Sequence, residues 1–244
     1  MKPSIVAAAV FLPVLSLLML LRAQQAPAPP TLESVLKKMD QAAANFNTTQ
    51  ADFEWDRFER VLNEVDDVQT GTVYFRRTSK EIEMKADVKT DGASADQLKP
   101  EPKEVLFSNG KIQVFQPKAN IVNVYDAGKN REAIETYLVL GFGGSGEDLQ
   151  KSFDVKLLGT ESINNVTTAK LELVPKSEKV RNNFSRIILW IDLQSGISVQ
   201  QQLFEPQGDY KLAKYSSIRQ HEKISDDVFK LKTNSKTQFI LTKG

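Results

Sequence analysis

The sequence contains no cysteine and only one histidine, and this scarcity rules out several kinds of site. Without cysteine there is no disulfide framework, no thiolate metal site and no cysteine to carry a lipid anchor. A metal ion would have to rely on carboxylates, and the acidic pairs Asp66-Asp67 and Asp226-Asp227 lack the spacing of a calcium-binding loop. We therefore expect neither a metal nor a cofactor.

An excess of charge of either sign is also missing. The chain has 32 Lys and Arg against 31 Asp and Glu, a formal net charge of +1. Nucleic-acid-binding domains usually carry a clear basic excess on one face or along one helix. Nucleic acid is therefore not an expected partner.

Signatures of catalysis are equally sparse. His221 lies in the charged run from Arg219 to Lys223, and no G-x-S-x-G elbow is present to expose a nucleophile. The run Gly141–Gly146 matches G-x-G-x-x-G, but hairpins are expected before and after it instead of the βαβ unit that dinucleotide binding requires. We expect a protein that is not an enzyme.

The N-terminus is typical of a secretory signal peptide. Lys2 precedes an apolar run of 17 residues from Ile5 to Leu21, interrupted by Pro13. We expect residues 1–23 to be removed after Ala23, with cleavage after Ala26 or retention as a membrane anchor as alternatives. Residues 24–30 contain three prolines and are expected to form a tether. A soluble periplasmic protein is predicted.

The mature chain is expected to form a single domain over residues 31–244. Thr31 can cap an amphipathic helix that begins at Leu32 and includes Phe46. From Ala51 the apolar period becomes two, which indicates strands. The expected strands are 51–56, 71–77, 82–88, 104–116 as a hairpin, 121–125, 153–158, 168–174, 185–193, 197–204, 210–218 and 229–231. The polar stretch Lys89–Lys103, with two prolines, is expected to be a long loop.

The most informative stretch is Glu104–Gln116. Asn109-Gly110 tolerates the positive φ of a two-residue type I′ turn, so Phe107 is expected opposite Ile112 and Val105 opposite Val114. Repeated hairpins indicate an antiparallel sheet, and so many strands rarely stay flat. The predicted fold class is α+β, mainly β: a curved antiparallel sheet that forms an open half-barrel capped by a few helices.

The strand from Arg186 to Asp192 is apolar on both faces, with Ile187 and Leu189 on one and Ile188 and Trp190 on the other. Two interpretations remain open. The strand is either central, with a helix over one face and a core on the other, or one of its faces lines a lipid cavity, because a core and a cavity lining have the same composition.

The order of several motifs resembles the LolA family of periplasmic lipoprotein carriers. These motifs are the helix from Leu32, Ala51-Asp52-Phe53, Gly71–Arg77, Ser108–Lys111, Leu173–Lys176 and Ile224–Phe229. The resemblance implies a carrier that moves lipoprotein acyl chains from the inner to the outer membrane, loaded by an inner-membrane transporter and unloaded to an outer-membrane receptor. It also implies a monomer, a lid helix over Arg131–Leu140 and a glycine hinge beside that helix.

Two sets of site residues follow. Inward-alternating apolar positions are expected to line the lipid cavity: Phe53, Trp55, Val73, Phe75, Met84, Phe107, Ile112, Val114 and Leu189. By the resemblance, Arg77 matches a basic residue that latches the lid in the unloaded state, although Thr78 stands where the family has proline. The alternative function is a carrier or sensor of another lipid, either a glycolipid-binding protein or a regulator similar to RseB.

Overall fold

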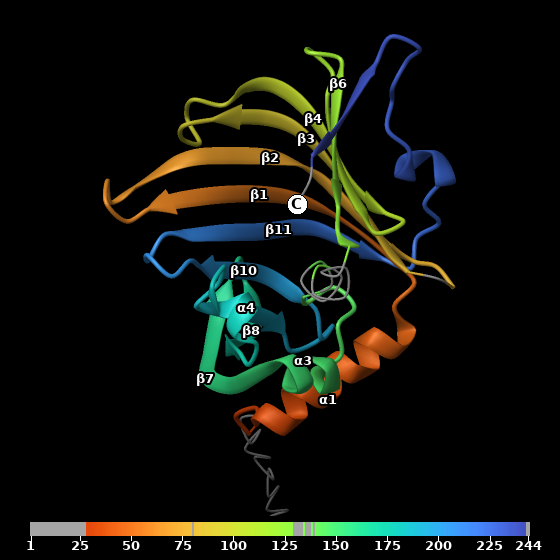
Figure 1. The fold of residues 1–244 in the computed structure, drawn as a ribbon. Coiled ribbons are helices and arrows are strands. Elements are labelled where there is room, and N and C mark those ends of the chain that lie inside the picture. The colour runs from red at the N-terminus through yellow and green to blue at the C-terminus, as the bar shows by residue number, and fades with distance from the viewer. Residues whose placement is uncertain (1–27, 80, 129–133, 135–137, 139, 243–244) are drawn as a thin grey trace, which may run out of the picture.

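The computed structural model describes residues 28–79, 81–128, 134, 138 and 140–242. The expected signal peptide, the start of the tether and most of the expected lid helix lie outside these residues. The described chain forms one large, open, curved sheet of twelve strands with a few helices, as predicted (Figure 1). None of its helices is long and apolar enough to cross a membrane.

The sheet consists of two meanders, each preceded by a helix. The first follows α1 (Leu32–Asn45) and contains β1 (Thr48–Glu59), β2 (Glu64–Arg77), β3 (Ile82–Gly92), β4 (Lys99–Ser108), β5 (Lys111–Gln116) and β6 (Ile121–Asp126). The second follows α3 (Gly146–Ser152) and contains β7 (Phe153–Ile163), β8 (Val166–Pro175), α4 (Glu178–Arg181), β9 (Arg186–Asp192), β10 (Ser198–Phe204) and β11 (Tyr210–Gln220). β1 pairs with β11, and this pairing joins the two meanders.

Local sequence signals explain the elements that were predicted well. The Thr31 hydroxyl accepts a hydrogen bond from the Ser34 N–H, which caps α1. Asn109 and Gly110 have φ values of 53° and 68°, so the turn takes the left-handed geometry that it was expected to need. Phe107 lies opposite Ile112, and Val105 opposite Val114, which confirms the predicted register.

The prediction of a long loop over Lys89–Lys103 is wrong. β3 continues to Gly92 and β4 begins at Lys99, so the connection is short. β5 pairs only with Glu104–Ser108 of β4, which leaves one edge of Lys99–Lys103 without a strand partner in the described chain. Prolines are tolerated at such an open edge, because their missing N–H costs no ladder bond there. Pro100 and Pro102 therefore do not end the strand.

The C-terminal part also differs from expectation. Residues Asp226–Phe229 form a 3-10 helix, η2, instead of leading into a strand over 229–231. The chain then crosses the sheet and adds β12 (Gln238–Thr242), which pairs in parallel with β6. The sequence signal for η2 is Ser225, whose hydroxyl accepts a hydrogen bond from the Asp227 N–H as the N-cap.

The two faces of the sheet have different covers. We call the face that packs against α1 the inner face and the opposite one the outer face. On the inner face, Val35, Leu36 and Met39 of α1 pack on β8 and β9, where Ile187, Leu189 and Ile191 are fully buried. One side of the doubly apolar strand is thus core under a helix, as the first interpretation held.

The C-terminal segment covers part of the outer face. The Arg76 guanidinium lies 4.2 Å from the Phe229 ring centre and pairs with Asp226. Beneath this segment Lys85 is buried, and its Nζ lies 2.8 Å from Asp87 Oδ1 and 2.9 Å from Glu104 Oε2. An ion cluster therefore sits between β3, β4 and the segment that follows η2.

The ladder between β10 and β11 is incomplete. It runs from Phe204 opposite Tyr210 to Gln200 opposite Lys214 and stops there. Yet β10 continues to pair with β9 as far as Ser198, and β11 continues to pair with β1 as far as Gln220. The two strands diverge, and Ser217, with a φ of 49°, lies at the irregular part of β11. We call this opening the β10–β11 split.

Candidate functional site

The predicted cavity-lining residues lie on the inner face, and all but one of them gather over β1 to β5. Phe53, Val73, Phe75, Met84 and Phe107 form one buried cluster, against which Trp55 and Ile112 pack. Val114 lies on the same face, because it is opposite Val105 in the hairpin register. Leu189 lies apart, in the core under α1 and α3. The structure thus brings together eight of the nine residues over β1 to β5.

Two aromatic side chains are buried in this apolar cluster, and Ile134 and Leu138, from the expected lid helix, pack against it. Phe46, at the C-cap of α1, and Phe142 are both buried in it. The Phe142 ring stacks on Phe75 with ring centres 5.0 Å apart, and it meets Tyr215 edge-on at 4.6 Å. We call Phe46 and Phe142 the aromatic plug.

The backbone around Phe142 depends on its flanking glycines. Gly141 and Gly143 have φ values of 80° and 147°, in the range that favours glycine. A Cβ on Gly143 would lie 2.8 Å from the Phe46 ring, and one on Gly141 would lie 2.2 Å from Ser198 Cβ. The G-x-G motif therefore lets the chain bring Phe142 onto the inner face.

Arg77, the predicted latch, bridges the two segments that carry the plug. Its guanidinium donates hydrogen bonds to the Ala43 carbonyl of α1 at 3.2 Å and to the Gly143 carbonyl at 3.1 Å. It also lies 5.3 Å from the Phe46 ring centre, within the range of a cation–π contact. Thr78 forms the β2–β3 turn with Glu81, so its presence in place of proline leaves Arg77 in position.

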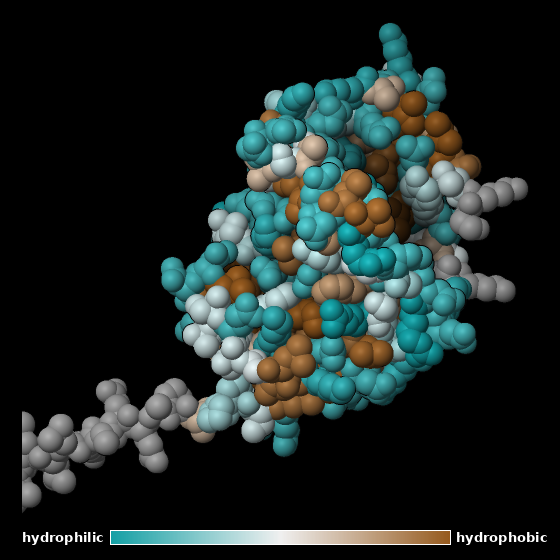
Figure 2. Space-filling model, turned by 90° about the vertical axis from the view of Figure 1, so that its left-hand side faces the viewer, coloured by the Kyte–Doolittle hydropathy of each residue, from teal (hydrophilic) through white to brown (hydrophobic). Residues whose placement is uncertain are grey.

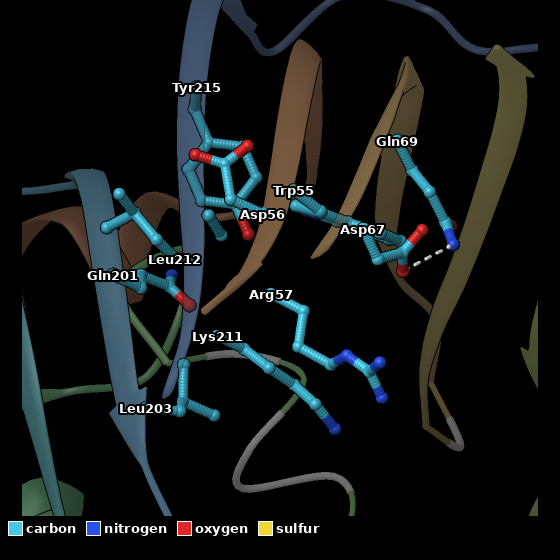
Figure 3. A pocket seen from close by; sticks show the side chains of 11 residues that line it. Trp55, Asp56, Arg57, Asp67, Gln69, Gln201, Leu203, Lys211, Leu212 and Tyr215 are labelled. Carbon is cyan, nitrogen blue, oxygen red and sulfur yellow. Dashed lines mark hydrogen bonds between the residues drawn. The ribbon is translucent and has the colours of Figure 1, made fainter. Parts of the chain in front are cut away.

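Beside the plug the inner face opens into a pocket of about 330 Å³ (Figure 3). Its apolar lining consists of Trp55, Leu203, Leu212, Ala213 and Tyr215. Its polar lining consists of Asp56, Arg57, Asp67, Gln69, Gln201 and Lys211. Trp55 stacks on Phe53 at 3.9 Å, which connects the pocket to the apolar cluster. On the side shown in Figure 2, brown apolar surface is recessed between teal polar rims.

The pocket's polar residues were missed at the sequence level. The alternation Ala51, Phe53, Trp55 continues to Arg57, which places Arg57 on the inner face, but only apolar positions were considered as lining residues. Arg57 pairs with Asp66, and this hydrogen bond lowers the pKa of Asp66. Burial and the neighbouring Asp91 carboxylate raise the pKa of Asp67.

Asp66 and Asp67 should therefore respond to pH in opposite ways. The folded state holds a proton on Asp67 to a higher pH than the unfolded state does, so this group's contribution to stability falls as pH rises above about 3.8. Asp67→Asn is expected to gain stability over wild type as pH rises through the folded pKa. Asp66→Asn should lose the stability that the bond from Arg57 to the Asp66 carboxylate gives wild type above about pH 3.8, and the two proteins should become equally stable in acid.

Urea unfolding of both variants at several pH values measures these differences. Equal pH profiles for the two variants would contradict the assignment, because neighbouring residues of one strand then would not differ in environment.

His221 is exposed, and its Nδ1 lies 3.1 Å from Asn47 Oδ1. Within the described residues, no three His, Cys, Asp or Glu side chains cluster as metal ligands would.

Solved structures of other proteins have a fold similar to that of this chain. MucB is 14% identical over 86% of this chain, with a TM-score of 0.50, and this chain spans 65% of MucB. An uncharacterized conserved protein from Thermus thermophilus is 9% identical over 86% of this chain and 98% of its own, with a TM-score of 0.52. A LolA superfamily protein from Nitrosomonas europaea is 14% identical over 83% of this chain and 98% of its own, with a TM-score of 0.38.

The chain has a LolA-like fold. This confirms the fold that the sequence resemblance implied. A family model described as "Uncharacterized protein" matches residues 142–243, which run from the plug residue Phe142 through β7 to β12 of the LolA-like fold. No curated protein matches the sequence.

Proposed function

We propose that residues 31–244 form a single LolA-like domain that carries acyl chains of lipoproteins through the periplasm and catalyses no reaction. The observation that carries this proposal is the aromatic plug: Phe46 and Phe142, whose segments are bridged by Arg77, are buried in a continuous apolar surface on the inner face. Ile134 and Leu138 pack against the same surface. An acyl chain offers the same kind of apolar contact and can take the place of the plug.

Capture and release must both be possible for a carrier. Burying a methylene contributes about 0.8 kcal/mol, so even part of an acyl chain favours the protein over water. The plug opposes binding by the free energy of its own burial, so it limits affinity and permits release. By the same resemblance, an inner-membrane transporter loads the protein, which is a monomer with a cleaved signal peptide, and an outer-membrane receptor unloads it.

The test is to isolate the tagged protein from a periplasmic extract and identify bound molecules by mass spectrometry. Lipoprotein or diacylated peptide in the bound fraction is the expected result. A glycolipid would support the alternative carrier of another lipid, and a regulatory protein would support a lipid sensor. Protein free of any lipid, and unable to bind added acyl chains, would contradict the proposal.

Replacing Arg77 with Leu is expected to retain acyl binding and to slow release. The empty, closed state loses two hydrogen bonds and a cation–π contact, so it competes less well with the loaded state. A loss of about 1.4 kcal/mol slows release about tenfold. The measurement is transfer of labelled lipoprotein to an acceptor, beside equilibrium binding.

Arg76→Leu is the matched control, because Arg76 lies on the outer face with Glu83 and Asp226. Equal effects of the two substitutions on transfer would mean that Arg77 has no special role in the closed state.

A further inference from the structure

The β10–β11 split contains a second groove, of about 390 Å³. Its aliphatic lining comes from the β7–β8 hairpin, the β9–β10 turn and both diverging strands: Ile163, Val166, Ile197, Val199 and Ile218. Val199, Ile163 and Val166 also pack with Trp190 in the apolar cluster of the outer face. This groove, which we call the outer groove, thus opens on the side of the sheet opposite α1 and the plug.

The outer groove meets the inner pocket at Tyr215. This residue lines both, and burial raises the pKa of its phenol, as expected for a hydroxyl in apolar surroundings. Ile218 likewise packs against both the inner cluster of Phe53 and the outer cluster of Trp190. No ladder between β10 and β11 separates the two spaces at this point.

The segment that carries the plug fills the split from the inner side. The Ser198 N–H donates to the Gly141 carbonyl at 2.8 Å, and the Gln201 amide donates to the Leu140 carbonyl. Ser198 lies beyond the end of the β10–β11 ladder, whereas Gln201 still pairs with Ala213 of β11. If Phe142 leaves the inner face, as the proposed function requires, its edge contact with Tyr215 is lost and the boundary between the two spaces loosens.

We propose that the split is a passage for one alkyl chain, with the polar end of the ligand in the inner pocket and the methyl end in the outer groove. This inference rests on the proposed function and names a second binding surface for the same ligand. Each space alone is close to the lower limit of about 300 Å³ for ligand pockets, and joined they would hold a longer chain.

The polar and charged lining residues of the two spaces determine which way round the alkyl chain of the ligand lies. The inner pocket is lined by Arg57 and Lys211 together with Asp56 and Asp67, of which Asp56 already pairs with Lys214 and Arg57 with Asp66. The outer groove has no cationic lining residue within the described chain. Its one charged lining residue, Asp192, already accepts hydrogen bonds from the Gln194 and Ser195 backbone. An anionic or ester group therefore finds partners in the inner pocket, and the outer groove offers aliphatic contact to the chain end.

The two tryptophans of the sequence report on the two sides separately. Trp55 lines the inner pocket, and Trp190 lies in the outer cluster beside the groove. The experiment uses Trp190→Phe and Trp55→Phe, each of which keeps one reporter. The probes are two octadecanoic acids, one brominated near the carboxyl end and one near the methyl end, because bromine quenches tryptophan only at short range.

An alkyl chain that passes through the split should make the two probes quench Trp55 and Trp190 in opposite order of strength. Bromine near the carboxyl end should quench Trp55 more strongly, and bromine near the methyl end should quench Trp190 more strongly. Quenching of Trp55 alone would overturn the passage and leave the proposed function standing. Equal quenching of Trp190 by both probes would indicate adventitious surface binding and would also overturn it. No quenching of either reporter would contradict both proposals.

Val166→Glu places a charge in the outer groove at a half-buried position beside the hairpin turn. It is expected to abolish quenching of Trp190 while quenching of Trp55 persists. Leu158→Glu is the control, since Leu158 is 51% exposed on β7, the other strand of that hairpin, and does not line the groove. Circular dichroism of both variants verifies the fold. Loss of Trp190 quenching in both would mean that the groove has no specific part in binding.

Discussion

Replacing Phe142 with Ala is expected to increase binding of an acyl chain or hydrophobic dye by the empty protein while lowering its stability. Phe142 is 1% exposed and contacts Phe75 and Tyr215, so its removal leaves a cavity and costs about 3–5 kcal/mol. A ligand no longer has to displace the ring. Each 1.4 kcal/mol saved in this way tightens binding about tenfold.

Phe153→Ala separates this effect from general loosening. Phe153 is 2% exposed, but it lies in the core under α1, away from the plug. The same chemical change there should lower the free energy of unfolding to a similar extent without raising dye binding. Dye fluorescence titration and urea unfolding measure the two quantities. Equal gains in dye binding for both variants would show that the plug does not control access.

Replacing Lys85 with Met is expected to destabilise the fold by about 3–5 kcal/mol, because it leaves Asp87 and Glu104 near one another without their buried cation. Glu104 also accepts a hydrogen bond from the Lys232 N–H at 3.2 Å. The substitution should therefore speed hydrogen exchange in the segment after η2 as well as shift the urea midpoint.

Lys118→Met provides the surface comparison. Lys118, between β5 and β6, pairs with Glu101 of β4, but both side chains are about half exposed. Such pairs contribute roughly 0–1 kcal/mol. Adding Glu104→Gln to Lys85→Met should restore part of the lost stability, because it removes one of the unpaired charges. A Lys85→Met protein as stable as wild type would contradict the inferred role of the cluster.

Sequence patterns predicted the elements whose cause is local. Thr31 and Asn109-Gly110 act through their own backbone neighbourhood, so the first helix and the central hairpin could be placed without tertiary information. Pro100 could not be interpreted in this way, because its tolerance depends on how far β5 extends along β4. The course of the chain through and after η2 likewise depends on contacts far away in sequence, of Asp226 with Arg76 and of the Lys232 N–H with Glu104.

Of the nine predicted lining residues, only Trp55 lines the inner pocket, and the polar residues of the pocket were not predicted. Alternation identified Phe53 and Phe107, but the same alternation applied to Arg57 was not followed to the inner face. Phe142 was passed over because the glycines around it were interpreted as a hinge alone. A large aromatic residue between two glycines could have indicated an inserted side chain, since the glycines let the backbone approach Phe46 and Ser198.

The junction of the two meanders also sets the order in which the protein can fold. β1 lies in the middle of the sheet, and one of its edges is completed only when Thr49 meets Gln220. Such a distant pairing must overcome a large loop-closure entropy, which slows folding. The first meander alone would leave β1 as an unprotected edge that could pair with another chain. Folding to completion must therefore wait until nearly the whole chain is available.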